Sequence, residues 1–482
     1  MLKHPRLTAA ELRAAFSPEG LSLIDLPCKS SELQNGVIEI QLRKRFCYLF
    51  FVAVLFSSCA ASSPLIQPQI NSLAAAGKLD YALDVLKENG EGYGKNNRLL
   101  YQMDYGLLLH LDGRYKESIP VFEVAKRTWE QLYTTSLSKG AATWIINDNM
   151  APYHGEDFER VMINIFQALN FAMMSNLEEA LVEARDVDGK LSALNRLYKP
   201  DQKNVYREDA FARFLMGILY EAQGTAGDLN DAFISYAKAV EIYEEDYQAQ
   251  YGLEIPRILK ENMLTAAHFM GGDEYRRYKN KFGDGTHPTI EEKNNKGEIY
   301  LFQYDGLSPI KHQGFVPVPL PGGYITKLAF PQLDERTSES NPGIFEAVSR
   351  QPGGRRVFTC ETQKAEPIGA IAMKNFGNRK GRVIAKAALR SAGKYVLERS
   401  QEVRVRQSYG QEPSRWFRYL SNLYNIASEE PDLRSWQTLP SEIRLARFLL
   451  DPGEYELLFN GGTLGNVHVL AGEKKFFIVR TR

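Results

Sequence analysis

Side chains able to perform acid–base or nucleophilic chemistry are scattered along this sequence. The densest group is His154, Glu156 and Asp157, which could bind a metal ion or transfer protons. A glycine followed by acidic residues is also an ordinary helix start, and we prefer the interpretation of a solvated helix start. Cys360 follows a strand-like run and is interpreted as a core thiol. Serine-nucleophile, zinc-protease, phosphate-loop and paired-cysteine motifs are all missing, so the sequence predicts no catalytic residue, cofactor or metal.

A set of four cations recurs every four residues in a segment expected to be helical: Arg382, Lys386, Arg390 and Lys394. At this spacing the four side chains share one helix face. One interpretation is a cationic stripe that binds anionic lipid headgroups or an acidic partner. The other, which we favour, is a solvated face or one neutralised by Glu429, Glu430 and Asp432. Nucleic acid is not an expected partner, because the formal net charge is +0 and aromatic residues do not alternate with these cations.

An apolar run near the beginning of the chain has the proportions of a secretion signal. Three cations at 43–45 precede an apolar stretch over 46–56, which two serines and Cys59 follow. The stretch is too short for a transmembrane helix, which needs about 20 apolar residues. The ending resembles the lipobox of bacterial lipoproteins, with Phe56 where leucine is usual, and this implies cleavage before Cys59 and acylation of its sulfur. The alternative is a buried strand that happens to end in cysteine.

Residues 1–58 are therefore expected to lie outside the fold, as a signal peptide preceded by an over-extended start. The true start would lie near Val37 or Leu42, and a genuine extension is the alternative. Ala60 follows the cysteine, which by resemblance to lipoprotein sorting rules favours the outer membrane, facing the periplasm. After cleavage and acylation only Cys360 remains available, so no intramolecular disulfide is expected.

Apolar residues at helical spacing predict pairs of helices in the first half of the chain. In the clearest unit, small residues at Gly106, Ser118 and Ala125 let two helices approach and Phe122 fills the space between them, which resembles a tetratricopeptide repeat. Further units are predicted around Gly77, Ala82 and Leu86, around Ala168, Phe171, Ala180 and Ala184, and around Gly217, Tyr220, Ala232, Tyr236 and Ala239. About four stacked pairs over 63–280 are expected to form an α-solenoid.

Solenoids of this kind bind partners along a concave face, which the first helix of each pair lines. The repeat pattern places seven residues on that face: Met103, Leu107, His110, Ile165, Leu169, Phe214 and Glu221. In one interpretation they bury an apolar segment of an envelope protein, while polar contacts at the rim set its orientation. The alternative is that they are core residues. Substitution of Phe214 would then reduce stability and leave binding unchanged.

The second half of the chain is predicted to be an α+β domain. Residues 281–296 are charged and rich in turn formers, which predicts a linker, and the domain over 297–482 follows. Its expected strands are mainly antiparallel and lie at 298–304, 314–320, 324–330, 444–450, 455–460, 466–470 and 475–479. A helical block is expected at about 367–427. The predicted fold class is thus multidomain α+β, with the solenoid first.

Three blocks of sequence stand out: Gly155–Glu159 leading to Ala180–Arg185, then Gly306–Pro309, and Asp432–Pro440. Together they resemble an uncharacterised family of bacterial envelope lipoproteins with tetratricopeptide-like repeats. The resemblance implies a location and an architecture but no reaction. In the last block, we expect Trp436 to pack the helical block against the terminal sheet and Arg434 to lie near an acid.

The sequence therefore favours a non-enzymatic, lipid-anchored scaffold or adaptor. It would bind protein partners through its repeats in envelope assembly, cell-wall synthesis or polymer export. The alternatives are an envelope hydrolase or transferase, or a lipid or glycan carrier, with its site in the second domain. An open groove on the repeats would indicate a scaffold, whereas a cleft in 297–482 would indicate an enzyme.

Overall fold

The computed structural model describes residues 66–138, 151–197, 206–283, 285–336, 342–350 and 355–481. The chain divides into two compact units, Met1–Cys59 and Ala60–Arg482, and all described residues belong to the second. The predicted signal segment and the lipidation site Cys59 lie outside the described residues, so both stay predictions. None of the helices in the described ranges is long and apolar enough to cross a membrane.

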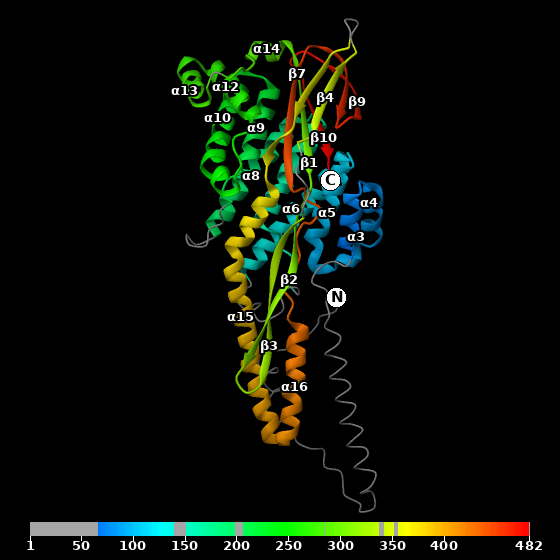
Figure 1. Ribbon diagram of the computed structural model, residues 1–482, viewed down its shortest axis with the longest axis vertical. Coiled ribbons are helices and arrows are strands. Elements are labelled where there is room, and N and C mark those ends of the chain that lie inside the picture. The colour runs from blue at the N-terminus through cyan, green and yellow to red at the C-terminus, as the bar shows by residue number, and fades with distance from the viewer. Residues whose placement is uncertain are drawn as a thin grey trace, which may run out of the picture. The chain divides into compact units, whose positions relative to one another are not determined.

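The first half of the second unit is a stack of helix pairs (Figure 1). The pairs are α3 (Gln67–Ala75) with α4 (Leu79–Glu88), α5 (Arg98–Leu111) with α6 (Tyr115–Ser138), α7 (Asp157–Met173) with α8 (Leu177–Leu197), α9 (Ala210–Gln223) with α10 (Ala226–Ile242), and α12 (Arg257–Met270) with α13 (Gly272–Phe282). Short helical turns connect some of them: η1 (Gly90–Tyr93), η2 (Lys95–Asn97), η6 (Tyr243–Tyr247) and α11 (Gln248–Tyr251). The predicted helical repeats are confirmed, with five pairs described where about four were expected.

Glycines allow the two helices of a pair to approach closely. A Cβ atom built on Gly106 would lie 2.6 Å from the ring of Phe122, and one built on Gly217 would lie 2.3 Å from the ring of Tyr236. The Ser118 hydroxyl donates to the Gly106 carbonyl at 2.7 Å, across the same contact. The predicted steric pairing of a small residue with an aromatic ring is therefore confirmed in two repeats.

Strands and one helical hairpin make up the second half. The strands are β1 (Gly297–Asp305), β2 (Leu307–Leu320), β3 (Tyr324–Arg336), β4 (Ile344–Ser349), β5 (Val357–Glu361), β6 (Gln363–Glu366), β7 (Glu442–Leu450), β8 (Gly453–Phe459), β9 (Gly462–Val469) and β10 (Lys474–Arg480). In the described ranges they form sheets of order β10-β1-β7-β6 and β5-β4-β8-β9 and a β2–β3 hairpin. The pairing of β1 with β10 is parallel and the other pairings in these ranges are antiparallel, as the sequence predicts for most strands.

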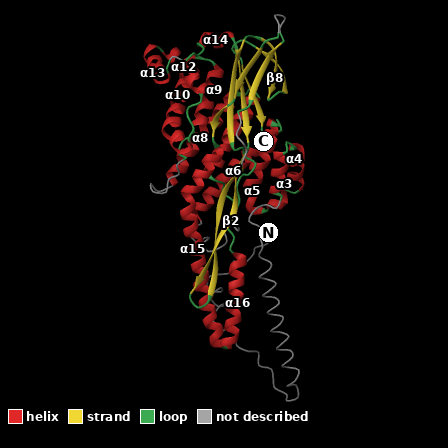
Figure 2. Ribbon diagram, viewed as in Figure 1, coloured by secondary structure: helices red, strands yellow, loops and turns green. Residues whose placement is uncertain are grey.

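The segment expected to be a helical block is a hairpin of α15 (Ile368–Tyr409) and α16 (Gln411–Ser428). The two helices meet at Gly410, whose φ of 89° is a left-handed conformation that glycine adopts without strain. The β2–β3 hairpin runs beside α15 and α16 (Figure 2). Asn422 of α16 holds the tip of the β2–β3 hairpin, because its side chain accepts from the Ile325 N–H at 2.9 Å and donates to the Gly323 carbonyl at 3.1 Å.

Strand β1 joins the repeats to the sheets because both of its faces are covered. Four residues on the first helices of successive pairs contact its side chains: His110 with Tyr304, Phe166 with Tyr304, Phe211 with Phe302, and Asn262 with Tyr300. On its other face, Ile299 and Leu301 belong to a second apolar cluster that fills the space between the two sheets. Repeats and sheet therefore share one apolar core.

The predicted linker, 281–296, does more than connect. It contains the short helix α14 (Ile290–Asn295), and Thr289 caps this helix by accepting from the Glu292 N–H at 3.1 Å. The Lys293 ammonium is buried and lies 2.5 Å from a Glu221 carboxylate oxygen on α9. The segment is thus held against the repeats by a buried charge. Its charged, turn-rich composition predicted an exposed linker and gave no sign of this burial.

Candidate functional site

All seven residues predicted to line an open groove are buried: Met103, Leu107, His110, Ile165, Leu169 and Phe214 are 0% exposed, and Glu221 is 8% exposed. Strand β1 and its neighbours occupy the face that these side chains line. The prediction of an open groove is therefore corrected, and the core interpretation holds. The physical reason is that the chain buries its own aromatic strand where a partner peptide was expected.

Glu221 belongs to a buried ion cluster with Lys293, Glu298, Arg447 and Lys474. Lys293 lies 3.6 Å from Glu298, Lys474 lies 3.2 Å from Glu221, and Arg447 lies 3.8 Å from Glu298. Burial opposes ionisation of Glu298, but the three cations outweigh it and lower the pKa of that carboxyl. Burial lowers the pKa of Lys293. The cluster joins α9, α14, β1, β7 and β10, so it holds the repeats and the sheet together.

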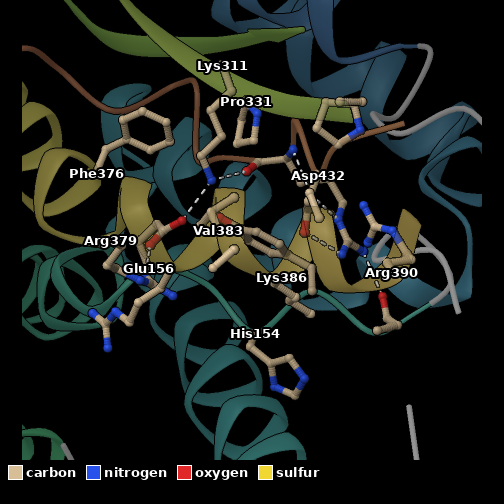
Figure 3. A pocket seen from close by; sticks show the side chains of 18 of the residues that line it. His154, Glu156, Lys311, Pro331, Phe376, Arg379, Val383, Lys386, Arg390 and Asp432 are labelled. Carbon is tan, nitrogen blue, oxygen red and sulfur yellow. Dashed lines mark hydrogen bonds and ion pairs between the residues drawn. The ribbon is translucent and has the colours of Figure 1, made fainter. Parts of the chain in front are cut away.

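A pocket of about 660 Å³ opens beside the start of α7 (Figure 3). Its lining side chains come from four parts of the chain: the loop 151–156, strands β2 and β3, one face of α15 over 376–390, and the segment 431–434. Repeats, hairpins and the Asp432–Pro440 block therefore all contribute to it. We take this pocket as the candidate functional site.

Cations dominate the pocket. Its described lining residues include six cations and two acids: Lys311, Arg379, Arg382, Lys386, Arg390 and Arg434, with Glu156 and Asp432. Lys394 of the predicted stripe is not in the lining. It lies 2.5 Å from Glu429, and the buried Arg390 lies 3.1 Å from the same carboxylate. Half of the stripe is thus paired with Glu429, as the alternative interpretation stated, and three of its four residues, Arg382, Lys386 and Arg390, line the pocket.

Glu156 organises one end of the pocket. The Lys311 ammonium lies 2.7 Å from one of its carboxylate oxygens, and Arg379 pairs with the other (Figure 3). Burial opposes ionisation of Glu156, but Arg379 and Lys311 outweigh it and lower the pKa of the carboxyl to about 2. Burial, with the nearby cations Arg160 and Arg434, also lowers the pKa of His154. The ionised Glu156 carboxylate therefore fixes the positions of Lys311 and Arg379 at this end of the pocket.

The acidic residues at the start of α7 order the helix start, as the sequence predicts, but Asp157 and Glu159 are buried and not solvated, because the rest of the fold covers them. Glu159 accepts from the Glu156 N–H at 2.8 Å and from the Tyr153 hydroxyl at 2.5 Å, and Asp157 lies 3.6 Å from Arg160. Among the described residues, the structure finds no group of three or more histidine, cysteine or acidic side chains that could hold a metal ion.

Parts of the three sequence blocks singled out above are hydrogen-bonded to one another next to this site. The Ser308 N–H donates to the Leu439 carbonyl at 2.8 Å, and Lys311, two residues after the second block, donates to the Arg434 carbonyl at 3.0 Å. The Trp436 N–H donates to the Glu159 carboxylate at 2.7 Å. Blocks far apart in the sequence are thus joined by buried hydrogen bonds.

Within the last block, Arg434 is placed as predicted and Trp436 is not. The Arg434 guanidinium lies 2.8 Å from the Asp432 carboxylate. The ring of Trp436 lies 5.9 Å from Phe166 and 6.3 Å from Phe122, so it packs onto the repeats. The expectation that it joins the helical block to the terminal sheet is corrected, since an aromatic ring gains most from the larger apolar core.

Sequence reasoning missed Lys311 and Arg379 as pocket residues. Arg379 stands three residues before Arg382 on one helix, so the stripe could have been extended to it. Lys311 lies on a strand far away in the sequence, and no local pattern marks it.

Comparisons with known proteins include a distant likeness to a solved structure. No protein-family model and no curated protein sequence matches the chain. The crystal structure of a kinesin light chain-like protein of Podosopora anserina, with nearly identical TPR-like repeats, is similar over 45% of this chain and 95% of its own, at 13% identity and a TM-score of 0.26. The presence of repeats in this chain rests on the helix pairs described above and not on this likeness.

Proposed function

We propose that the protein is a lipid-anchored scaffold or adaptor of the bacterial cell envelope that holds an acidic segment of a partner protein in the cationic pocket. The observation that supports this best is the pocket lining, in which cations outnumber carboxylates six to two. Carboxylates of a partner would form charge-assisted hydrogen bonds with Arg382 and Lys386, which give orientation and specificity. The apolar rings and methyl groups of Phe376 and Val383 would contact its neighbouring side chains.

The inner face of the repeats is not available for this partner, because the chain's own sheet fills it. The pocket takes most of its lining from the second half of the chain, which is where an enzyme was expected to have its cleft. Its two carboxylates are engaged, however: Glu156 with Lys311 and Arg379, and Asp432 with Arg434. This favours binding over proton transfer.

The proposed pocket is tested with a fluorescent polyglutamate peptide and the full-length protein in detergent. We expect the double variant Arg382→Glu/Lys386→Glu to bind the peptide at least about tenfold more weakly, because two attractive charges become repulsive. Arg404→Glu is the matched control, since Arg404 lies on the same helix outside the pocket lining and should bind as the native protein does. Equal binding by both variants contradicts the proposal. Pocket-dependent binding of phosphatidylglycerol vesicles without peptide binding supports the lipid-carrier alternative.

The anchor is tested separately. We propose that the sulfur of Cys59 is acylated and that the protein lies on the periplasmic side of the outer membrane, because several acyl chains anchor a protein stably. Cys59→Ala should move the protein from the membrane fraction to the soluble fraction. Retention of the variant in membranes contradicts this anchor and leaves the pocket proposal unaffected.

A further inference from the structure

The guanidinium of Arg480, on the last residue of β10, is buried without a partner. The residue as a whole is partly exposed, but its two terminal nitrogens, Nη1 and Nη2, are shielded from solvent and have no hydrogen-bond partner among the residues that the structure describes. By contrast, the buried Lys293 ammonium lies 2.5 Å from Glu221, and the buried Arg390 guanidinium lies 3.1 Å from Glu429. Buried charges are costly unless they are paired, so the Arg480 guanidinium needs an acceptor.

The charge of Arg480 is also uncompensated. Burial lowers the pKa of Arg480 to about 10, and no acidic group in the described part of the chain opposes this shift. Burial acts in the same way on Arg447, but Tyr300 and Glu298 outweigh it and raise the pKa of that guanidinium. Arg480 therefore lacks the anionic surroundings that stabilise the charge of Arg447.

A second guanidinium lies near the first, on Arg336 at the end of β3. Its Nε donates to the Ser308 carbonyl at 2.6 Å, and its Nη2 donates to the Gln437 carbonyl. Both acceptors are neutral, so they hold the group in place without balancing its charge. Burial, followed by the charge of Arg480, lowers the pKa of Arg336 to about 10, while Asp104 acts in the opposite sense. The two arginines thus repel each other, and a bound anion would relieve this repulsion.

The strand register places the Arg480 guanidinium at the edge of the core that the repeats and the sheet share. Arg480 lies beside Tyr304 in the parallel pairing of β10 with β1. It stands on the same face of β10 as Phe476 and Ile478, because successive side chains alternate between faces, and both of these belong to or pack against the shared core. An ion contact at such a place is stronger than one in water, since little solvent surrounds it.

We infer that Arg480 and Arg336 form a binding site for one small oxyanion group, a phosphate or a carboxylate. A guanidinium donates two parallel hydrogen bonds and therefore fits two oxygens on one centre. A small group fits better than a charged polymer, because the terminal nitrogens of Arg480 are buried. Neither arginine belongs to the lining of the cationic pocket, so this is a second site that goes beyond the proposed function.

The site is tested by thermal unfolding of the full-length protein in detergent, in chloride buffer and after addition of phosphate at constant ionic strength. Phosphate should raise the melting temperature of the native protein at least about 2 °C more than that of Arg480→Met, because an anion stabilises only the folded state that binds it. General stabilisation by phosphate affects both proteins and cancels in this difference. Arg404→Met is the matched control, since Arg404 is exposed on α15, and it should respond as the native protein does. Equal responses of the native protein and Arg480→Met overturn the inference.

The same variant gives a second measurement in chloride buffer alone. Arg480→Met should melt at the temperature of the native protein or higher, because it removes an uncompensated charge and keeps an apolar side chain. A clearly lower melting temperature would mean that Arg480 has a partner within the chain, and it overturns the inference.

Two further comparisons locate the anion and identify it. Arg382→Glu/Lys386→Glu should keep the phosphate response, since these two residues line the pocket. A response that is lost in this variant and kept in Arg480→Met assigns phosphate binding to the pocket and overturns the inference. Acetate in place of phosphate distinguishes the two ligands: an Arg480-dependent response to acetate alone indicates a carboxylate, one to phosphate alone indicates a phosphate group, and both support the site.

Discussion

The imidazole of His110 and the hydroxyl of Tyr304 lie 2.8 Å apart, and they join helix α5 to the strand that fills the inner face of the repeats. The other ring nitrogen, Nδ1, lies 2.6 Å from the Asn170 carbonyl oxygen, and the Asn170 amide donates to Ser118 at 3.0 Å. Nδ1 therefore carries the proton and Nε2 accepts from Tyr304. The neutral imidazole is fixed between two partners in the fully buried core.

This arrangement makes stability depend on pH. Burial lowers the pKa of His110 to about 4, whereas in the unfolded chain it lies near about 6.5. The unfolded chain thus binds a proton first as the pH falls, so the stability is fully present above about pH 6.5 and is lost towards pH 4. We expect this residue to account for a loss of about 2 kcal/mol between pH 7.5 and 5 in urea unfolding.

The measurement needs a variant, because other buried groups titrate in the same range. Burial raises the pKa of Asp104 to about 7, which acts in the opposite sense by favouring the folded state at lower pH. His110→Gln removes only the contribution of the histidine to the pH dependence of stability. From pH 7.5 to 5, the stability of the native protein should therefore fall by about 2 kcal/mol relative to that of His110→Gln, whatever the sign of the net change. An identical pH dependence in the two proteins contradicts the prediction.

The buried ion cluster predicts a large effect for one charge and a small effect for its neighbour in the sequence. Lys293→Met removes a 3% exposed ammonium and leaves Glu221 and Glu298 with fewer cations. We expect a loss of about 3–5 kcal/mol in the free energy of unfolding. Lys296→Met, at a 39% exposed side chain 3.6 Å from Asp451, should cost less than about 1 kcal/mol. Equal losses would mean that the cluster does not hold the repeats to the sheet.

Replacement of two glycines by alanine should have opposite effects on stability, because one lies where paired helices approach closely and the other does not. Gly106→Ala introduces a methyl group 2.6 Å from the Phe122 ring and should destabilise the protein by about 1–3 kcal/mol. Gly377→Ala on α15 meets nothing within 4 Å and should be stabilising by about 0.5–1 kcal/mol, because alanine favours the helix. Thermal unfolding of both variants checks this. A stabilised Gly106→Ala would show that the ring moves aside.

The repeats and strands could be predicted because their signals are local. The pairing of Gly106 with Phe122 follows from residues sixteen positions apart, a spacing that belongs to the repeat itself. The ends of strands could be predicted from the turn residues beside them. Asn460 and Gly461, which come directly after β8, adopt φ of 49° and 78°.

The covered inner face could not be predicted, because a partner groove and a core require the same apolar residues on the first helices. One signal was available in β1. Tyr300, Phe302 and Tyr304 alternate with Ile299 and Leu301, and a strand that is apolar on both faces is normally buried on both. The pocket is even harder to predict from the sequence, since Lys311, Glu156 and Arg379 meet only after the fold has formed.

A substitution at Phe214 distinguishes most directly between the interpretation of the inner face as core and its interpretation as a groove. Its side chain is 0% exposed and its ring lies 6.1 Å from that of Tyr236 within one repeat pair. Phe214→Ala should therefore lower the free energy of unfolding by about 3–5 kcal/mol, because it removes a buried ring and leaves a cavity. Polyglutamate binding per folded molecule should not change, since Phe214 lies outside the pocket lining.

The control for this last variant is Phe315→Ala, at a ring that is 60% exposed on β2. It should cost less than about 1 kcal/mol, because little apolar area returns to water. Melting temperature and peptide binding are measured on the same samples of both variants. If Phe214→Ala kept its melting temperature and lost binding, the ring would contact the partner, and the inner face of the repeats would have to open for it.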